Sequence, residues 1–197
     1  MTHNNLKMTK IAIFASGSGS NAENIINYFK NSGTGHVSAV FCNKKDAYVL
    51  ERAKNSGIES IVFDRNDFYE TDKIVKDLES RNIDYIVLAG FLWLVPENLV
   101  KKYENRIINI HPALLPSYGG KGMYGDNVHK AVVANGEKKS GITIHLVNTI
   151  YDSGDIIFQA ETEVTPEDDY KSVAKKIHEL EGEHFPRVIE EHIKSLQ

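Results

Sequence analysis

Short apolar runs alternate with amphipathic stretches along the first 110 residues. The apolar runs predict buried strands at 11–16, 36–42, 58–63, 85–89 and 107–110. The stretches between them carry apolar residues at helical spacing and predict helices at 24–30, 47–55, 71–80 and 97–103, the last one beginning after Pro96. Strands that alternate with helices predict a mainly parallel sheet with helices on both faces.

The pattern changes after residue 111. A helix is predicted at 126–134, and two apolar runs at 142–147 and 156–164 follow with only a short loop between them. That spacing favours an antiparallel extension of the sheet. Two helices, at 168–181 and 186–196, are predicted to close the chain. The fold class is therefore α/β with an antiparallel C-terminal part.

Composition narrows the class of protein. The chain has 197 residues, 41% of them hydrophobic and 25% charged, with a formal net charge of −4. These values predict one globular domain over 1–197, with 1–9 as a flexible N-terminal extension, and argue against a nucleic-acid partner. No apolar run approaches the ~20 residues of a membrane span, and no signal peptide is visible, so we expect a cytoplasmic protein without membrane association. The single cysteine, Cys42, excludes a disulfide framework within one chain.

A loop rich in glycine and serine links the first predicted strand to the first predicted helix. Residues 16–21 read Ser-Gly-Ser-Gly-Ser-Asn. Glycines let the backbone approach a ligand, and a helix N-terminus offers unpaired N–H groups, so the loop predicts a phosphate site. A plain strand–helix turn is the alternative. A dinucleotide site is disfavoured because the second strand has no acidic residue before Asp46. A P-loop is excluded because the sequence lacks its Gly-Lys-Ser/Thr motif.

The fifth strand ends in a polar pair, Asn109 and His111. Residues two apart in a strand point the same way, and ligands bind beyond the carboxyl ends of parallel strands. An amide donor and a protonated imidazole together suit a developing oxyanion. The following segment, 111–125, has no periodicity, which is typical of a lid or binding loop. A proline-rich crossover with a structural histidine is the alternative.

Asp152 lies in the loop after the run 142–147. A carboxylate near His111 would favour the imidazolium and could accept a proton from an attacking amine. Ordinary turn chemistry is the alternative for this aspartate. His111 and His145 with an aspartate could indicate a metal, but the spacings match no zinc pattern, so no metal site is predicted.

These motifs resemble the phosphoribosylglycinamide formyltransferase family over roughly residues 10–190. Shared blocks are the loop at 16–21, Leu-Ala-Gly-Phe at 88–91, Asn-Ile-His-Pro-Ala-Leu-Leu-Pro at 109–116, and Asp152 with Gly154. The resemblance implies a single-domain Rossmann-like formyltransferase fold. It also implies transfer of the formyl group of 10-formyltetrahydrofolate to the glycyl amine of 5-phosphoribosylglycinamide in purine biosynthesis.

Site residues follow from the resemblance. It implies a catalytic set of Asn109, His111 and Asp152. The ribonucleotide would contact Gly19, Ser20, Asn21 and Glu181. The formylfolate pterin would contact Asn109 and the four residues Leu92, Trp93, Leu94 and Val95. Trp93 stands where family members often have arginine, the loop at 118–127 is longer than theirs, and His129 receives no role.

Three other functions stay open at this point. They are formyltetrahydrofolate hydrolysis, another formyl transfer of the same superfamily, and a non-catalytic phosphate-binding module. Formylation of methionyl-tRNA is disfavoured because no second, basic domain is seen. We expect two small-molecule substrates as partners, no metal cofactor, and a monomer or weak homodimer.

Overall fold

The computed structural model describes residues 8–197, which form two compact units. One unit contains the residues up to Phe91 together with Pro186–Gln197, and the other contains Leu92–Phe185. Residues 1–7 of the predicted N-terminal extension lie outside the described residues. Thr9, the last residue of the predicted extension, instead begins the first strand. The single domain over 1–197 stays a prediction.

The first unit contains four parallel strands in the order β3-β2-β1-β4. They are β1 (Thr9–Ala15), β2 (Gly35–Cys42), β3 (Glu59–Val62) and β4 (Tyr85–Leu88). The connecting helices are α1 (Ser20–Phe29), α2 (Val49–Asn55), α3 (Arg65–Tyr69) and α4 (Lys73–Ser80). These elements confirm the predicted parallel strands and three of the helices.

An aromatic cluster fills the core of this unit. The ring of Phe14 in β1 stacks on Phe41 in β2, with centroids 4.8 Å apart. Around Phe14 lie Phe63, Phe68 and Phe91, and the ring centroids within this group are 5.2–6.3 Å apart. Such rings bury large apolar areas and also attract one another edge to face. They fix the strand ends from which the neighbouring loops leave.

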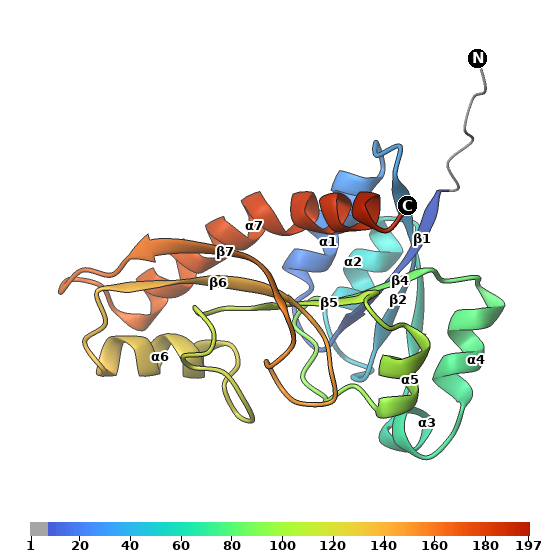
Figure 1. Ribbon diagram of the computed structural model, residues 1–197, viewed down its shortest axis with the longest axis horizontal. Helices are drawn as coiled ribbons and strands as arrows, with labels where there is room; N and C mark the ends of the chain where they lie inside the picture. Colours follow the sequence, from blue (N-terminus) through green and yellow to red (C-terminus); the bar gives the residue numbers. More distant parts are fainter. Residues whose placement is uncertain (1–7) are drawn as a thin grey trace. The chain divides into compact units, whose positions relative to one another are not determined.

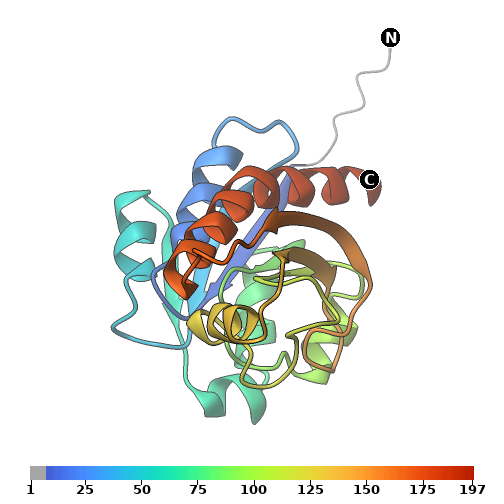
Figure 2. The ribbon, with the colours of Figure 1, turned by 90° about the vertical axis from the view of Figure 1, so that its left-hand side faces the viewer.

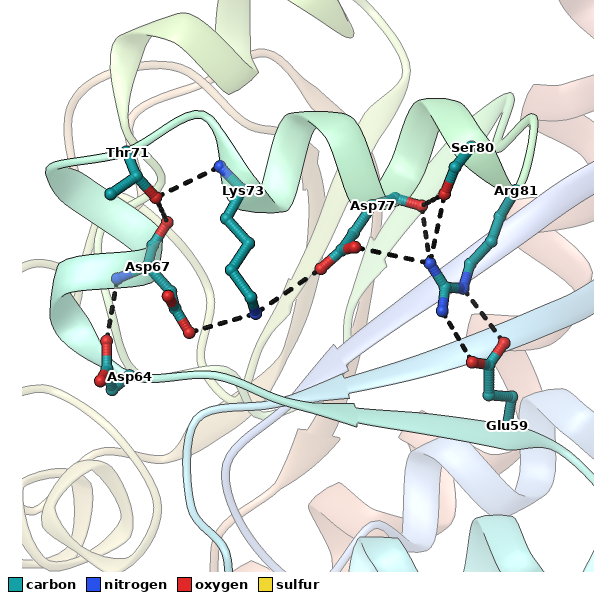
Figure 3. Close-up of polar contacts among 8 residues, drawn as sticks. All are labelled: Glu59, Asp64, Asp67, Thr71, Lys73, Asp77, Ser80 and Arg81. Carbon is teal, nitrogen blue, oxygen red and sulfur yellow. Dashed lines mark hydrogen bonds and ion pairs between the residues drawn. The ribbon is translucent and has the colours of Figure 1, made fainter.

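Sequence reasoning missed α3, which lies in a segment predicted as loop. The Oδ1 atom of Asp64 accepts the backbone N–H of Asp67 at 2.8 Å, so Asp64 caps the helix N-terminus. A chain of exposed charges continues along α4 (Figure 3). Arg81 donates to both carboxylate oxygens of Glu59, and Lys73 lies 3.2 Å from Asp67. This short helix is stabilised by its cap and lacks the long apolar stripe by which the other helices were predicted.

The second unit carries the antiparallel part of the fold. It contains α5 (Glu97–Lys102), β5 (Ile107–His111), α6 (Asp126–Ala134), β6 (Lys139–Leu146) and β7 (Ile156–Glu163). β6 pairs antiparallel with both β5 and β7, and Figure 1 shows β6 and β7 as long neighbouring strands. The predicted antiparallel extension is therefore confirmed. The register places Asn109 opposite His145, and His111 opposite Thr143.

The C-terminal segment corrects one prediction. In place of two helices, α7 runs without interruption from Tyr170 to Ser195, with Pro186 inside it (Figures 1 and 2). A proline removes one helical hydrogen bond, which costs about 3 kcal/mol in a helix interior. Phe185 and Ile189 are fully buried on either side of the proline, and burial of their side chains offsets that cost. Within residues 8–197, no helix has the length and apolar character needed to cross a membrane.

Candidate active site

His111 and Asp152 face each other in the second unit. The Nδ1 atom of His111 lies 3.5 Å from Oδ2 of Asp152, and the two side chains are 4% and 12% exposed. His111 ends β5, whereas Asp152 lies in the loop between β6 and β7, with φ of +51°. The structure thus brings together two residues that the sequence placed 41 positions apart. A left-handed backbone is uncommon for a residue other than glycine, and aspartate is among those that tolerate it best.

The second ring nitrogen of His111 contacts the backbone of the following loop. Nε2 lies 2.7 Å from the carbonyl oxygen of Tyr118, and because a carbonyl only accepts, Nε2 carries a hydrogen. Burial lowers the pKa of His111 below its ordinary value, and the attraction of Asp152 offsets this only in part. Burial therefore favours the neutral form of His111 in the free protein. The imidazolium expected from the sequence during the reaction stays a prediction.

Asp152 is held as a carboxylate. Burial acts to raise its pKa, but the interactions with His145, with the nearby His111 and with the backbone N–H of Gly120 outweigh burial and keep the pKa below its usual range. Gly120 donates to Oδ2 of Asp152 at 2.9 Å. The group therefore contains an ionised acid next to a neutral imidazole, and it can accept a proton.

Asn109 joins the same group through His145. Its Nδ2 atom lies 3.0 Å from Nε2 of His145, whose Nδ1 atom lies 2.8 Å from the carbonyl of Leu146. Nδ1 of His145 therefore donates to that carbonyl, and Nε2 accepts from the amide of Asn109. Nε2 of His145 also lies 3.8 Å from Oδ1 of Asp152. Asn109, His145, Asp152 and His111 thus form one continuous polar chain.

A buried threonine holds the first part of the loop 111–125. Thr143 Oγ1 accepts the N–H of Leu115 at 2.9 Å and donates to the carbonyl of Ala113 at 2.7 Å. Gln159 donates to Thr143 at 2.8 Å and to the Leu115 carbonyl at 3.1 Å. Because these bonds fix the chain just after His111, the loop leaves the strand in a defined direction.

Gly154, which the sequence analysis pairs with Asp152, is required by the space around it. A Cβ atom at this position would lie 1.8 Å from the carbonyl oxygen of Leu146, which no side chain allows. The β6–β7 loop therefore passes close against the end of β6. That close approach holds Asp152 in place next to the strand.

The predicted phosphate loop lies in the first unit, at the start of α1. Gly19 is the N-cap residue, with φ of +78°, and it has no side chain to satisfy the first helical N–H groups. Gly17, Ser18 and Ser20 are exposed, whereas Asn21 is half-buried. An exposed helix N-terminus without a side-chain cap can accept an anion from solution.

Helix α2 shapes that loop. The backbone N–H of Val49 donates to the carbonyl of Gly17 at 3.1 Å, and a Cβ at Gly19 would lie 2.5 Å from the Val49 side chain. Arg52 donates from Nε to the carbonyl of Ser18 at 2.9 Å and also pairs with Glu23. The loop is therefore held from α2, and Gly19 is required by space as well as by its backbone angle.

The remaining predicted site residues lie in other segments. Val95 is buried, whereas Leu92, Trp93 and Leu94 are half-buried in the irregular stretch before α5. Glu181 is 8% exposed on α7. Among residues 8–197, no group of three or more histidine, cysteine, aspartate and glutamate side chains is arranged to hold a metal ion.

Sequence reasoning did not assign His145 and Tyr118 to the site. The signal for His145 is the antiparallel register, which pairs it with Asn109, but that register is not readable before the strands are aligned. Tyr118 contributes a backbone carbonyl, and a backbone atom has no sequence signature. Both omissions come from contacts that only the folded loop and strand pair create.

The family follows from comparison with known proteins. The family model described as "Formyl transferase" matches residues 9–189. The chain therefore belongs to the formyl transferase family and is a formyltransferase enzyme with the Rossmann-like fold of that family.

Relatives within the family narrow the comparison to phosphoribosylglycinamide formyltransferases. The chain is 42% identical to the chloroplastic enzyme of that name from Arabidopsis thaliana and 36% identical to that from Haemophilus influenzae. The alignments cover 94% and 92% of this chain, and 67% and 86% of those proteins. The chain spans 61% of the enzyme of that name from Vigna unguiculata. The solved Bacillus halodurans enzyme matches with a TM-score of 0.86 at 33% identity, covering 96% of this chain and 97% of that one.

Proposed function

We propose that the protein transfers a formyl group from 10-formyltetrahydrofolate to the glycyl amine of 5-phosphoribosylglycinamide. The observation that carries this proposal is the polar chain of Asn109, His145, Asp152 and His111, in which both histidines are buried, in a formyl transferase fold. Both substrates are small molecules. The product would be formylglycinamide ribonucleotide, formed in purine biosynthesis, and the folate would be released as tetrahydrofolate.

The Asp152–His111 pair would receive a proton. Formyl transfer removes one proton from the attacking amine and returns one to the folate nitrogen whose bond to the formyl carbon breaks. Asp152 is ionised, and Nδ1 of His111 lies 3.5 Å from it without a hydrogen while Nε2 is bonded to Tyr118. A proton accepted here converts His111 to an imidazolium paired with Asp152. The pair can then donate that proton to the leaving nitrogen.

Asn109 would stabilise the negative charge that develops on the formyl oxygen. One N–H of its Nδ2 atom donates to His145, which fixes the amide plane. A fixed amide can donate its second N–H without reorganising, and such preorganised donors contribute most to oxyanion stabilisation. The imidazolium of His111 would add a positive charge at the same stage.

We assign phosphate binding to Gly19, Ser20 and Asn21. The loop fits this group because Gly19 leaves the first N–H groups of α1 without a side-chain cap, and because its neighbours are exposed. Glu181 is assigned a contact with the same ribonucleotide on the family resemblance and its burial on α7.

The formyl donor would bind along Leu92, Trp93, Leu94 and Val95. When bound, it supplies the electrophilic formyl carbon. This segment has no helix or strand, and three of its apolar side chains are only half-buried. Partly exposed apolar surface suits a flat ring with polar edges. The backbone would supply the polar contacts at Trp93, where family members often have arginine.

Tetrahydrofolate release, measured by absorbance with and without phosphoribosylglycinamide, tests the function. The proposal predicts release only when both substrates are present. Release without the ribonucleotide would identify a formyltetrahydrofolate hydrolase. A protein that binds the ribonucleotide but releases no tetrahydrofolate would be a binding module, which would contradict the proposal.

A further inference from the structure

Tyr118 holds His111 through its backbone and is itself held through its side chain. Its carbonyl accepts the Nε2 hydrogen of His111 at 2.7 Å. At the other end, its hydroxyl donates to Oε1 of Glu137 at 2.6 Å and accepts from Nδ2 of Asn135 at 2.9 Å. Asn135 and Glu137 follow directly after α6. The tyrosine therefore connects the end of a helix to a ring nitrogen of His111.

The anchoring is needed because the backbone at this position is unfavourable. Tyr118 has φ of +57°, in the left-handed region that bulky side chains rarely adopt. A loop free to relax would leave this conformation and move the carbonyl away from His111. The two hydrogen bonds of the hydroxyl oppose such relaxation. Burial and the bond to Glu137 also raise the pKa of Tyr118, so the hydroxyl remains a donor.

The next two residues, Gly119 and Gly120, contact Asp152. A Cβ at Gly119 would lie 2.6 Å from the Leu115 side chain and 3.3 Å from Cβ of Asp152, so the turn packs directly on the aspartate. Gly120 then donates its N–H to Oδ2 of Asp152. One short turn, 118–120, therefore positions both members of the acid–base pair.

We propose that Tyr118 is a positioning residue that keeps the proton of neutral His111 on Nε2 and leaves Nδ1, which faces Asp152, as the atom that accepts a proton. The distances support this choice. The 2.7 Å contact of Nε2 is a hydrogen bond, whereas the 3.5 Å between Nδ1 and Asp152 is too long for a strong one. Oδ2 of Asp152 is already bonded to Gly120. If the turn relaxed, the proton would move to Nδ1, and the accepting atom would become Nε2, which does not face Asp152.

The first test is independent of activity. Ring-nitrogen NMR of the full chain labelled with ¹⁵N-histidine reports which nitrogen carries the proton, and the spectrum of His111→Asn assigns the signals. At neutral pH we expect His111 of the wild type to be protonated on Nε2 alone. Tyr118→Phe should give a mixture that includes the Nδ1-protonated form. A wild type already protonated on Nδ1, or no change in Tyr118→Phe, would overturn the inference.

The second test is kinetic and relies on the proposed function. Tyr118→Phe should lower kcat about tenfold, as expected when one hydrogen bond to a charged acceptor is lost, while the KM of each substrate stays within about twofold. Glu137→Ala should give the same result, and the double variant should be no worse than either single one. Tyr124→Phe is the control, because this tyrosine lies in the same loop and is half exposed.

The two tests separate two kinds of failure. An unchanged kcat in Tyr118→Phe, with KM altered or not, would contradict the positioning role. A wild type without formyl transfer would refute the proposed function, and the NMR result would still decide whether Tyr118 fixes the proton of His111.

Discussion

The charged network along α3 and α4 and the polar group around His111 both join acidic and basic side chains, but in different surroundings. In the network, Lys73 is 45% exposed and Glu59 56% exposed (Figure 3). Around His111, no member of the pairs with Asp152 exceeds 12% exposure. Water and salt screen the first group, so its pairs contribute little. In the second, burial shifts the pKa of His111 and acts against the ionised form of Asp152.

This difference shows what makes a group of charges reactive. The network satisfies each charge with an opposite one and leaves the charges on the surface. The His111 group combines an ionised carboxylate with an imidazole whose neutral form burial favours, so the group can accept a proton. Burial with a shared partner, rather than the number of charges, therefore marks the candidate site.

The largest effect is expected from His111→Ala. Removing the imidazole leaves Asp152 without a partner for the transferred proton and removes a charge that stabilises the oxyanion. We expect kcat to fall by roughly 10²–10³-fold. Initial rates of tetrahydrofolate formation at saturating substrates measure it, and circular dichroism confirms that the variant stays folded. A folded variant with near wild-type kcat would show that the buried group is structural, like the network.

Two arginines of equal exposure sharpen the comparison. Arg52 and Arg81 are 26% and 25% exposed, and each pairs with a glutamate, but only Arg52 also donates to the phosphate loop at the Ser18 carbonyl. Arg52→Ala should raise the KM for phosphoribosylglycinamide about tenfold, the effect of losing a hydrogen bond to a charged donor, without changing the KM for the formyl donor.

Arg81→Ala is the matched control for that experiment. It should leave both KM values unchanged and lower the free energy of unfolding by no more than about 1 kcal/mol, the usual range of exposed pairs. Equal KM changes in Arg52→Ala and Arg81→Ala would mean that the phosphate loop does not depend on Arg52.

Glu190 is intermediate in exposure between the surface network and the His111 group, with a side chain 16% exposed. Its substitution is expected to have a smaller effect, on the stability of the fold. Its carboxylate accepts hydrogen bonds from Ser32, Thr34, Tyr28 and Lys194, and the bond from Ser32 contributes most to lowering its pKa to about 2. A carboxyl with a lowered pKa stabilises the fold fully above its ordinary pKa and progressively less as pH falls. This contribution is therefore lost as pH falls from about 4.5 to about 2.

Urea denaturation of Glu190→Gln tests that contribution. The variant should be less stable than the wild type at pH 7, and the difference between the two proteins should shrink as the pH falls below 4.5. A constant difference across that range would show that the ionised carboxylate is not what stabilises this contact.

The fold was predictable wherever local patterns decide it. The helix predicted at 126–134 has the observed bounds of α6, because its apolar stripe and its flanking glycines are all local. Two predictions about helix bounds were wrong, because tertiary burial or a side-chain cap determines those helices. The sequence predicts a helix start at Pro186, but α7 continues through this proline, whose neighbours are buried. The unpredicted α3 depends on the cap at Asp64.

The site was predictable in part for the same reason. Asn109 and His111 share a strand face by simple alternation, so their proximity follows from the sequence. The loop position makes Asp152 a candidate acid partner of His111, and the family resemblance adds it to the catalytic set. The contact of His145 with Asn109 depends on strand register. The contact of His111 Nε2 with the backbone carbonyl of Tyr118 is one that no residue pattern indicates.

A structure of the protein with phosphoribosylglycinamide and an unreactive analogue of the formyl donor tests the central claim most directly. The account predicts that the amine and the formyl oxygen of the ligands lie within about 2.6–3.2 Å of polar atoms of Asn109, His111 or Asp152, or one water away. Ligands bound with their reacting atoms away from all three side chains would contradict it.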